Sequence, residues 1–292
     1  MTQHSYLFGC VGSDSSGSLG LQLHQREADR HGLRYLCRRV DGGRRSPHRK
    51  DVSALLRTCQ GFGYSGLSIT APFRQLAVEQ VDDVSEAAAC RGYLDLVLFT
   101  EEGRTIGHST DVDSCAAALA RGLPDRPLGR VLQVGADGVG DALAHALHDR
   151  GAEHLSVVDP DVHRAEALVA RLNAHAGGDW AKAFPADALR RLLGRADGLV
   201  NVLCPTANGR DLTAALVEVL HPDLWVFDFC YRPLGTALLR EGSARGCRVM
   251  HGGGVLVNQS ARAFRLVTGL SPHTARMFGD FADLTAGPQA HT

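Results

Sequence analysis

Residues 130–147 read RVLQVGADGVGDALAHAL, and this stretch decides the fold. Its first five residues, Arg130 to Val134, are mostly apolar and predict a buried strand. A turn with three glycines follows, and Val139 to Arg150 has the pattern of a helix. A strand that runs through a glycine-rich turn into a helix is the context that a dinucleotide-binding unit requires.

The turn departs from the G-x-G-x-x-G pattern at its middle glycine, because position 137 is aspartate. We expect a pyrophosphate at the helix N-terminus, where backbone N–H groups and the positive end of the helix dipole favour anions. The alternative is a unit whose glycines only make a tight turn. The expected cofactor contacts in this turn are Gly135, Asp137, Gly138, Val139 and Gly140.

Asp159 lies about 20 residues beyond the turn, at the end of the next predicted strand. An acid at this place accepts hydrogen bonds from the adenosine ribose and repels a 2′-phosphate, so the predicted cofactor is NAD rather than NADP. Arg164 and Gly254 complete the set of expected cofactor contacts.

Apolar runs alternate with helical patterns along the rest of the chain, which predicts an α/β fold with parallel strands. Residues 41–50 are rich in glycine, arginine and proline and predict a loop, and the tail after Thr285 is expected to be frayed. The further predicted strands are 6–11, 67–70, 94–99, 105–107, 155–158, 198–203, 225–229 and 248–250, and the further predicted helices are 19–31, 163–174, 234–246 and 258–270. Glu102 and Gly103 predict a hairpin that joins 94–99 to 105–107.

Composition excludes several classes of protein. The 292 residues include 31 Lys and Arg against 32 Asp and Glu, a balance that argues against a nucleic-acid binder. No apolar run approaches a membrane span, and residues 1–4 do not resemble a signal peptide, so we expect a cytoplasmic protein. The eight cysteines contain no CxxC pair, which predicts reduced thiols and no metal site.

Six segments, in order along nearly the whole chain, carry a resemblance to a known family. The segments are SLGLQLH (18–24), GLSITAPFRQ (66–75), GHSTD (107–111), VGADGVG (134–140), FDFCYRPLGT (227–236) and GVLVNQ (254–259). They resemble S-x-S-P-x-x-H, G-x-N-V-T-x-P-x-K-Q, G-x-N-T-D, the glycine turn, D-x-x-Y-x-P-x-x-T and G-M-L-x-x-Q of the shikimate/quinate dehydrogenases, especially their NAD-using bacterial branch.

The resemblance implies an α/β substrate domain formed by residues 1–112 and completed by C-terminal helices in 252–292. It implies a Rossmann-like NAD-binding domain in 113–251, with the active site in the cleft between the two domains. It also implies that Asp111 is catalytic and that Ser18, Ser68, Thr70, Asp95, Tyr231 and Gln259 contact the substrate.

Several substitutions fall on the family's chemistry. The catalytic lysine of the family is replaced by Arg74, which stays protonated near neutral pH but still donates hydrogen bonds to a developing alkoxide. The family's asparagines are replaced by Ser68, Asp95 and Ser109, and the N-A-T-P loop reads NVLCPTA (201–207). His24 and Cys204 are expected to be structural, and His251 to be a loop histidine.

Three functions remain open from the sequence. The first is an NAD-dependent oxidoreductase for a cyclic hydroxy or amino-hydroxy carboxylic acid in a specialised pathway, with Asp111 handling the proton and Arg74 holding charge. The second keeps the fold for lyase, isomerase or condensation chemistry, and the third is a non-catalytic binding protein. Each site residue also has a structural alternative: a helix cap for Asp111, a solvated side chain for Arg74, and an internal partner such as Arg74 for Asp95. The expected state is a monomer or homodimer that binds a small molecule.

Overall fold

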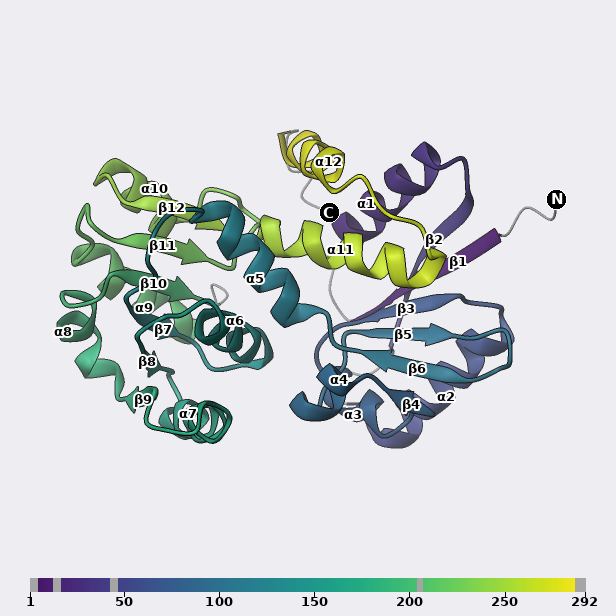
Figure 1. Cartoon of the computed structure of the whole chain (residues 1–292), viewed down its shortest axis with the longest axis horizontal. Helices are drawn as coiled ribbons and strands as arrows, with labels where there is room; N and C mark the ends of the chain where they lie inside the picture. The colour runs from purple at the N-terminus through teal and green to yellow at the C-terminus, as the bar shows by residue number, and fades with distance from the viewer. Residues whose placement is uncertain (1–4, 13–16, 43–46, 204–206, 287–292) are drawn as a thin grey trace. The chain divides into compact units, whose positions relative to one another are not determined.

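The computed structural model describes residues 5–12, 17–42, 47–203 and 207–286, without the side chains of 17, 18 and 207–211. The chain divides into two compact units (Figure 1). Unit 1 contains residues 1–110 and 256–292, and unit 2 contains residues 111–255. Assigning substrate to the first and nucleotide to the second stays a prediction.

The sheet of unit 1 has six strands in the order β2-β1-β3-β5-β6-β4. β1, β2 and β3 are parallel, whereas β5 pairs antiparallel with both β3 and β6. The predicted hairpin of 94–99 and 105–107 is confirmed by the antiparallel pairing of β5 with β6. The antiparallel pairing of β5 with β3 departs from the predicted parallel sheet, because the long segment between these two strands brings the chain back in the opposite direction. The strands are Ser5–Val11 (β1), Arg34–Val40 (β2), Gly66–Ile69 (β3), Asp83–Val84 (β4), Leu96–Phe99 (β5) and Thr105–His108 (β6).

Two apolar clusters in unit 1 combine residues of the sheet and the helices. One joins the sheet to α2 (Arg49–Gly61), α3 (Arg74–Val78) and α4 (Glu86–Arg91). The other joins it to α1 (Gly17–Arg30) and α11 (Gly253–Thr268), and α12 (Thr274–Ala286) lies beside α1. Phe264 of α11 is fully buried in this second cluster with Phe8 and Tyr35.

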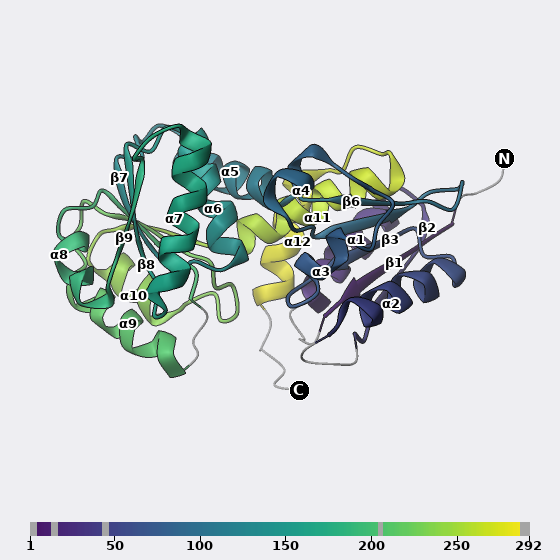
Figure 2. The same cartoon turned by 90° about the horizontal axis from the view of Figure 1, so that it is seen from below.

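Unit 2 is a doubly wound parallel sheet with the strand order β12-β11-β10-β7-β8-β9. Figure 2 shows it nearly edge-on, with α6 and α7 on one face and α8, α9 and α10 on the other. The strand order reverses between β7 and β10, and ligands of such sheets bind outside the carboxyl ends of strands at this point. The strands are Arg130–Val134 (β7), His154–Val158 (β8), Ala181–Phe184 (β9), Gly198–Asn201 (β10), Trp225–Asp228 (β11) and Arg248–His251 (β12).

The helices of unit 2 include one that the sequence located closely, α6 at Gly138–Asp149. Helix α11 begins at Gly253, five residues before its predicted start. It begins there although Gly252, Gly253 and Gly254 are consecutive glycines. The predicted loop at 41–50 is wrong in its last two residues, which belong to α2, and its residues 43–46, like the tail after 286, lie outside the described residues. The other helices of this unit are α5 (Asp111–Gly122), α7 (Val162–Ala176), the 3₁₀ helix η1 (Ala186–Ala188), α8 (Leu189–Leu193), α9 (Ala207–Glu218) and α10 (Ala237–Ala244).

The seven cysteines among the described residues are free thiols. Within that same part of the chain, no helix is long and apolar enough to cross a membrane.

Candidate active site

The glycine turn of unit 2 joins the carboxyl end of β7 to the first turn of α6. Gly135 has a φ of 104°, and a Cβ there would lie 2.4 Å from Val202. A Cβ on Gly140 would lie 2.7 Å from the carbonyl oxygen of Gly135. Only glycine fits these two positions, so the turn needs them for its shape whether or not a ligand binds.

Asp137 is the N-cap of α6. Its side chain accepts a hydrogen bond from the backbone N–H of Gly140 at 3.2 Å. The carboxylate therefore lies at the helix N-terminus, where the motif of the nucleotide-binding families has a glycine. By contrast, a Cβ on Gly138 would meet open space, and Val139 is the second residue of the helix.

Asp159 lies directly after β8 and is tied to the same turn. One carboxylate oxygen accepts the backbone N–H of Ala136 at 2.8 Å, and the other accepts that of Asp161 at 2.9 Å. The side chain is buried. Each oxygen keeps a lone pair after these bonds, so the carboxylate is oriented and still able to accept from a hydroxyl. Arg164, one turn into α7, is exposed and lies 3.7 Å from Asp161.

The side chain of Gln133 on β7 binds the glycine turn, a role that was not predicted from the sequence. Its side chain, at 0% exposure on β7, donates from Nε2 to the carbonyl oxygens of both Gly135 and Gly140 at 2.9 Å. Polar atoms in a strand that otherwise reads as apolar are the signal that could have found it. The amide holds the two ends of the turn together.

A polar network lies at the carboxyl ends of β10 and β11. Asp228 accepts from Asn201 Nδ2 at 3.2 Å and from the hydroxyl of Thr236 at 2.6 Å. Burial raises the pKa of the Asp228 carboxyl, and hydrogen bonds from Thr236, the Cys230 backbone and Asn201 act in the opposite direction. The network fixes the segment that carries Tyr231, whose ring packs edge-on against Phe229.

Hydrogen bonds in unit 1 bring together Thr70, Arg74 and Asp95. The Thr70 hydroxyl donates to the Val11 carbonyl at 2.9 Å, and Arg74 Nε donates to the Ile69 carbonyl at 3.1 Å. The backbone N–H of Ile69 donates to the Asp95 carbonyl at 2.8 Å. These residues surround the end of β3, where Ser68 also lies.

Asp95 is 6% exposed, and Thr110 donates to it through both its backbone and its side chain. Asp111 follows as the first residue of α5 and is also buried. The predicted catalytic aspartate thus begins a helix, where the dipole stabilises a carboxylate.

The remaining predicted contacts are dispersed. Gly254 and Gln259 lie on α11, in unit 2 and unit 1 respectively, and Gln259 is half-buried. Ser18 is the second residue of α1, but its side chain, like all of Cys204, lies outside the described residues. His24 is buried against Phe8 at 4.3 Å between ring centroids. The expectation that His251 lies in a loop is wrong, because it is the last residue of β12. Burial lowers the pKa of His251, and its Nδ1 accepts from the Gly253 N–H.

Cys10 of β1 and Ser68 of β3 are neighbours in the sheet of unit 1, and their side chains are hydrogen-bonded. Burial raises the pKa of the Cys10 thiol, while a hydrogen bond with Ser68 lowers it. Ser109 Oγ is buried and lacks a hydrogen-bond partner among the described residues. A hydroxyl in that state is available to a ligand atom or a water molecule.

Known proteins resemble this chain over nearly its full length, although no family model matches it. A shikimate dehydrogenase (NADP⁺) of Streptomyces avermitilis is 46% identical over 285 residues, covering 97% of each chain. A quinate/shikimate dehydrogenase (NAD⁺) of Corynebacterium efficiens is 37% identical over 97% of this chain and 100% of its own.

The solved structure of quinate dehydrogenase from Corynebacterium glutamicum in complex with NAD is 35% identical and has a TM-score of 0.86. The alignment covers 96% of this chain and 99% of that one. The α/β architecture predicted from the glycine turn is confirmed by this similarity. The chain belongs to the shikimate/quinate dehydrogenase family of oxidoreductases.

Proposed function

We propose that the chain is an NAD-dependent dehydrogenase of a cyclic hydroxy or amino-hydroxy carboxylic acid. The observation that carries the cofactor choice is the oriented carboxylate of Asp159 beside the glycine turn. Bound NAD would supply the acceptor for a hydride from a ring carbon of the substrate. A relative named as NAD-dependent and a structure solved with NAD support the same choice.

The residues of the turn fit a dinucleotide. Gly135 and Gly140 take the places of the first and third glycines of the motif, which make the tight turn and the close packing of α6, and Gln133 donates to their carbonyl oxygens. The N-terminus of α6 faces the proposed phosphate position with Gly138 and Val139. Asp137 opposes binding there through its charge, which predicts weaker affinity than a glycine at this position would give.

Asp159 favours NAD over NADP for an electrostatic reason. Its oxygens accept from ribose hydroxyls, and its negative charge repels a 2′-phosphate. The two backbone N–H groups that bind the carboxylate hold it in place beside the glycine turn. Arg164 belongs to the same proposed site, at the start of α7.

The proton and the charge of the substrate fall to Asp111 and Arg74 in this proposal. The Asp111 carboxylate takes the hydroxyl proton as the carbonyl forms and returns it in the reverse direction. Arg74 keeps its own proton and donates hydrogen bonds to the developing oxyanion. Thr70, Ser68, Ser18, Tyr231 and Gln259 are the proposed contacts to the substrate's hydroxyl and carboxylate groups.

Asp95 is the basis for proposing a substrate other than shikimate itself. An amide at this position donates and accepts, whereas a carboxylate only accepts and carries a charge. The carboxylate accepts from Thr110, and an amino group on the ligand would add a charge-assisted hydrogen bond to it. The proposed substrate therefore carries an amine or another strong donor where shikimate has a hydroxyl.

Calorimetric titration with NADH and NADPH tests the proposal. We expect the natural chain to bind NADH at least roughly tenfold more tightly, since one charge-assisted contact is worth ~1.5–3 kcal/mol. Asp159→Ala should remove most of this preference. Asp161→Asn is the matched control, because it removes a charge two residues away and keeps an acceptor for the α7 cap. Tighter binding of NADPH would overturn the choice of cofactor, and binding of neither would overturn the function.

A further inference from the structure

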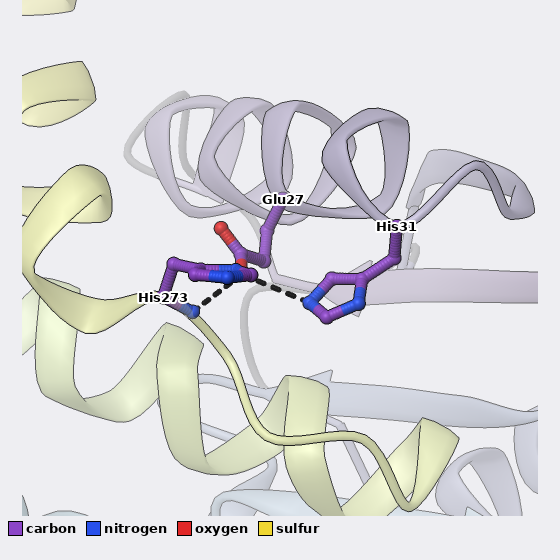
Figure 3. Close-up of side chains that lie close together, drawn as sticks. All are labelled: Glu27, His31 and His273. Carbon is purple, nitrogen blue, oxygen red and sulfur yellow. Dashed lines mark hydrogen bonds and ion pairs between the residues drawn. The ribbon is translucent and has the colours of Figure 1, made fainter.

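Three potential metal ligands converge in unit 1, and none of them is among the residues proposed for catalysis or substrate binding. Glu27 lies in the last turn of α1, His31 directly follows that helix four residues later, and His273 directly precedes α12 (Figure 3). One oxygen or nitrogen atom from each side chain lies within 4.8 Å of the other two. Glu27 and His273 are 246 positions apart, so only the fold brings the three together.

The distances match one face of a tetrahedral zinc site. Glu27 Oε1 lies 3.2 Å from His31 Nε2 and 3.1 Å from His273 Nδ1. Zinc bonds of ~2.0–2.1 Å place adjacent ligand atoms of a tetrahedron about 3.3 Å apart. Each imidazole nitrogen therefore already lies at about this spacing from Glu27 Oε1, and the three atoms all lie within 4.8 Å of one another.

Glu27 Oε1 is also crowded with nitrogen atoms. Besides the two imidazoles, it accepts the backbone N–H of His273 at 2.5 Å. A carboxylate oxygen has two lone pairs, so three donors exceed what it can accept with good geometry. An ion bound to Oε1 and to the imidazole lone pairs would replace two of these donors by direct ligand bonds.

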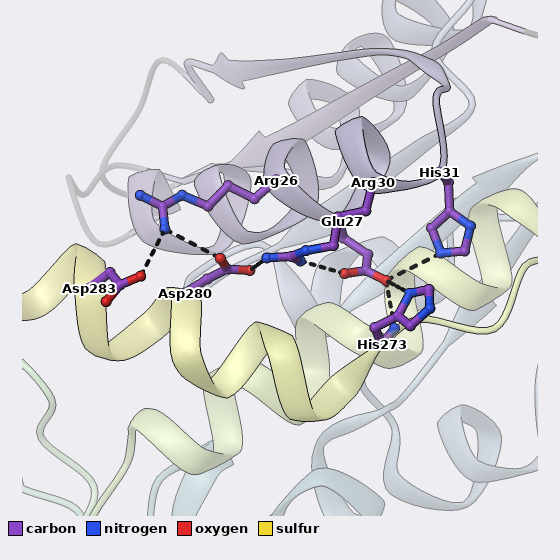
Figure 4. Close-up of polar contacts among 7 residues, drawn as sticks. All are labelled: Arg26, Glu27, Arg30, His31, His273, Asp280 and Asp283. Atoms are coloured by element: carbon purple, nitrogen blue, oxygen red, sulfur yellow. Dashed lines mark hydrogen bonds and ion pairs between the residues drawn. The ribbon is translucent and has the colours of Figure 1, made fainter.

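The other Glu27 oxygen is held by an arginine, which sets the carboxylate's orientation. Arg30 Nη1 donates to Glu27 Oε2 at 2.7 Å, and Arg30 also pairs with Asp280 (Figure 4). Ligating carboxylates in metalloproteins are hydrogen-bonded in this way, which fixes the oxygen that faces the metal. Burial opposes ionisation of Glu27, but the His273 and Arg30 contacts keep its pKa below the ordinary value.

The charge of the network leaves room for a cation. Arg26 and Arg30 face three carboxylates, those of Glu27, Asp280 and Asp283. One negative charge remains when the imidazoles are neutral, so a divalent ion changes the net charge only from −1 to +1. Exposure increases across the cluster, from 0% for the Glu27 side chain to 18% for His31 and 49% for His273. Water can reach the cluster on its histidine side.

We propose that Glu27, His31 and His273 form a Zn²⁺ site with water as the fourth ligand. Two imidazoles and one carboxylate are a donor set that zinc accepts, whereas calcium and magnesium require oxygen ligands. The ion links α1 to the segment that begins α12. The site is independent of the proposed dehydrogenase activity, and its test needs neither substrate nor NAD.

The test uses the untagged full chain after removal of metal by a chelator. We expect calorimetry with ZnCl₂ to give one ion per chain, and Co²⁺ to give the visible absorption bands of tetrahedral coordination. His31→Gln and His273→Gln should each weaken Zn²⁺ binding by roughly tenfold or more. Glutamine keeps a donor toward Glu27, and a melting curve in chelator shows whether each variant folds. Glu27→Gln is a poorer test because it also removes the partner of Arg30.

His148→Gln and His175→Gln are the matched controls. These residues belong, with Asp149, to another group of possible ligands in unit 2. They should leave the affinity unchanged. Unchanged Zn²⁺ affinity in both the His31 and His273 variants, a loss confined to the unit 2 variants, or no stoichiometric binding would each overturn the proposal and leave a hydrogen-bonded cluster.

Discussion

The buried carboxylate of Asp95 accepts hydrogen bonds from both the backbone N–H and the hydroxyl of Thr110, at 2.9 and 2.7 Å. Thr110 directly precedes Asp111, the first residue of α5. The substitution of an amide by a carboxylate at position 95 therefore does not leave a charge without donors. The two hydrogen bonds also fix the backbone of Thr110, directly before Asp111, the proposed proton acceptor.

Asp95 should determine ligand preference. We expect the natural chain to bind an amino-substituted cyclic acid roughly tenfold more tightly than its hydroxyl analogue, because a charge-assisted bond is worth ~1.5–3 kcal/mol. Asp95→Asn should abolish this preference in a competition titration. Thr110→Ser keeps both donors to Asp95 and serves as the control. Equal affinities for the two ligands in both the natural chain and Asp95→Asn would rule out an amine contact.

Arg74 should make turnover of shikimate and quinate slow, because a guanidinium does not exchange its proton near neutral pH. The measurement is kcat/KM against pH for the natural chain and for Arg74→Lys. We expect the lysine variant to gain an alkaline limb that the natural chain lacks, with little recovery of rate while Asp95 remains. Rapid oxidation of shikimate by the natural chain would contradict this prediction.

Asp137 combines a helix cap with an unfavourable charge, and two variants separate these effects. Asp137→Asn keeps an oxygen for the Gly140 N–H, and Asp137→Gly removes the side chain at a cost of only a few tenths of a kcal/mol. Both should tighten NADH binding by roughly two- to fivefold, since a charge at a helix terminus is worth ~0.3–1 kcal/mol. Weaker binding in both variants would mean that the carboxylate assists the cofactor.

His24 should make the fold sensitive to acid. Burial lowers its pKa from 6.5 to about 3, so the unfolded chain takes up a proton at a higher pH than the folded chain. The contribution of His24 to the free energy of unfolding is fully present above pH 6.5. It falls by about 1.4 kcal/mol per pH unit as the pH drops from 6.5 to about 3. Urea unfolding between about pH 7.5 and 5 measures the slope.

The variant His24→Phe preserves stacking on Phe8 and removes the titrating group, although it leaves the Tyr35 hydroxyl without its 3.0 Å partner. We therefore expect lower stability at every pH but a reduced slope. His163→Gln, at an exposed position, should keep the natural slope. An unchanged slope in His24→Phe would show that other groups cause the acid sensitivity.

Strands that are buried on both faces could be predicted well from the sequence. β7 was predicted at its observed bounds, because a short run rich in valine and leucine is typical of a parallel strand that is covered on both faces. β2 was missed because RYLCRRV contains three arginines, which an edge strand tolerates on its exposed positions. The hairpin of β5 and β6 was predicted, but the antiparallel pairing of β5 with β3 was missed because pairing direction depends on the path of the chain between two strands rather than on local pattern.

Site residues were accessible from the sequence only where a motif marked them. Asp159 and the turn glycines follow from spacing, but the capping role of Asp137 requires the helix geometry that places Gly140 beside it. Gln133 and the cluster of Glu27, His31 and His273 have no local signature. The roles of these residues depend on groups that only the fold brings together. Gln133 contacts Gly140 across the glycine turn, and Glu27 contacts His273, which is 246 positions away.

Helix α11 joins the two units and gives the chain a nested order of synthesis. Unit 2 is one continuous segment, whereas unit 1 requires Phe264 to complete its cluster with Phe8 and Tyr35. Domains fold as units while the chain emerges, the N-terminal ones first when they are continuous. Here the interrupted unit begins first and finishes last. The nascent chain therefore carries an uncovered apolar face of β1 and α1 throughout the synthesis of unit 2, and this is the stage at which aggregation competes with folding.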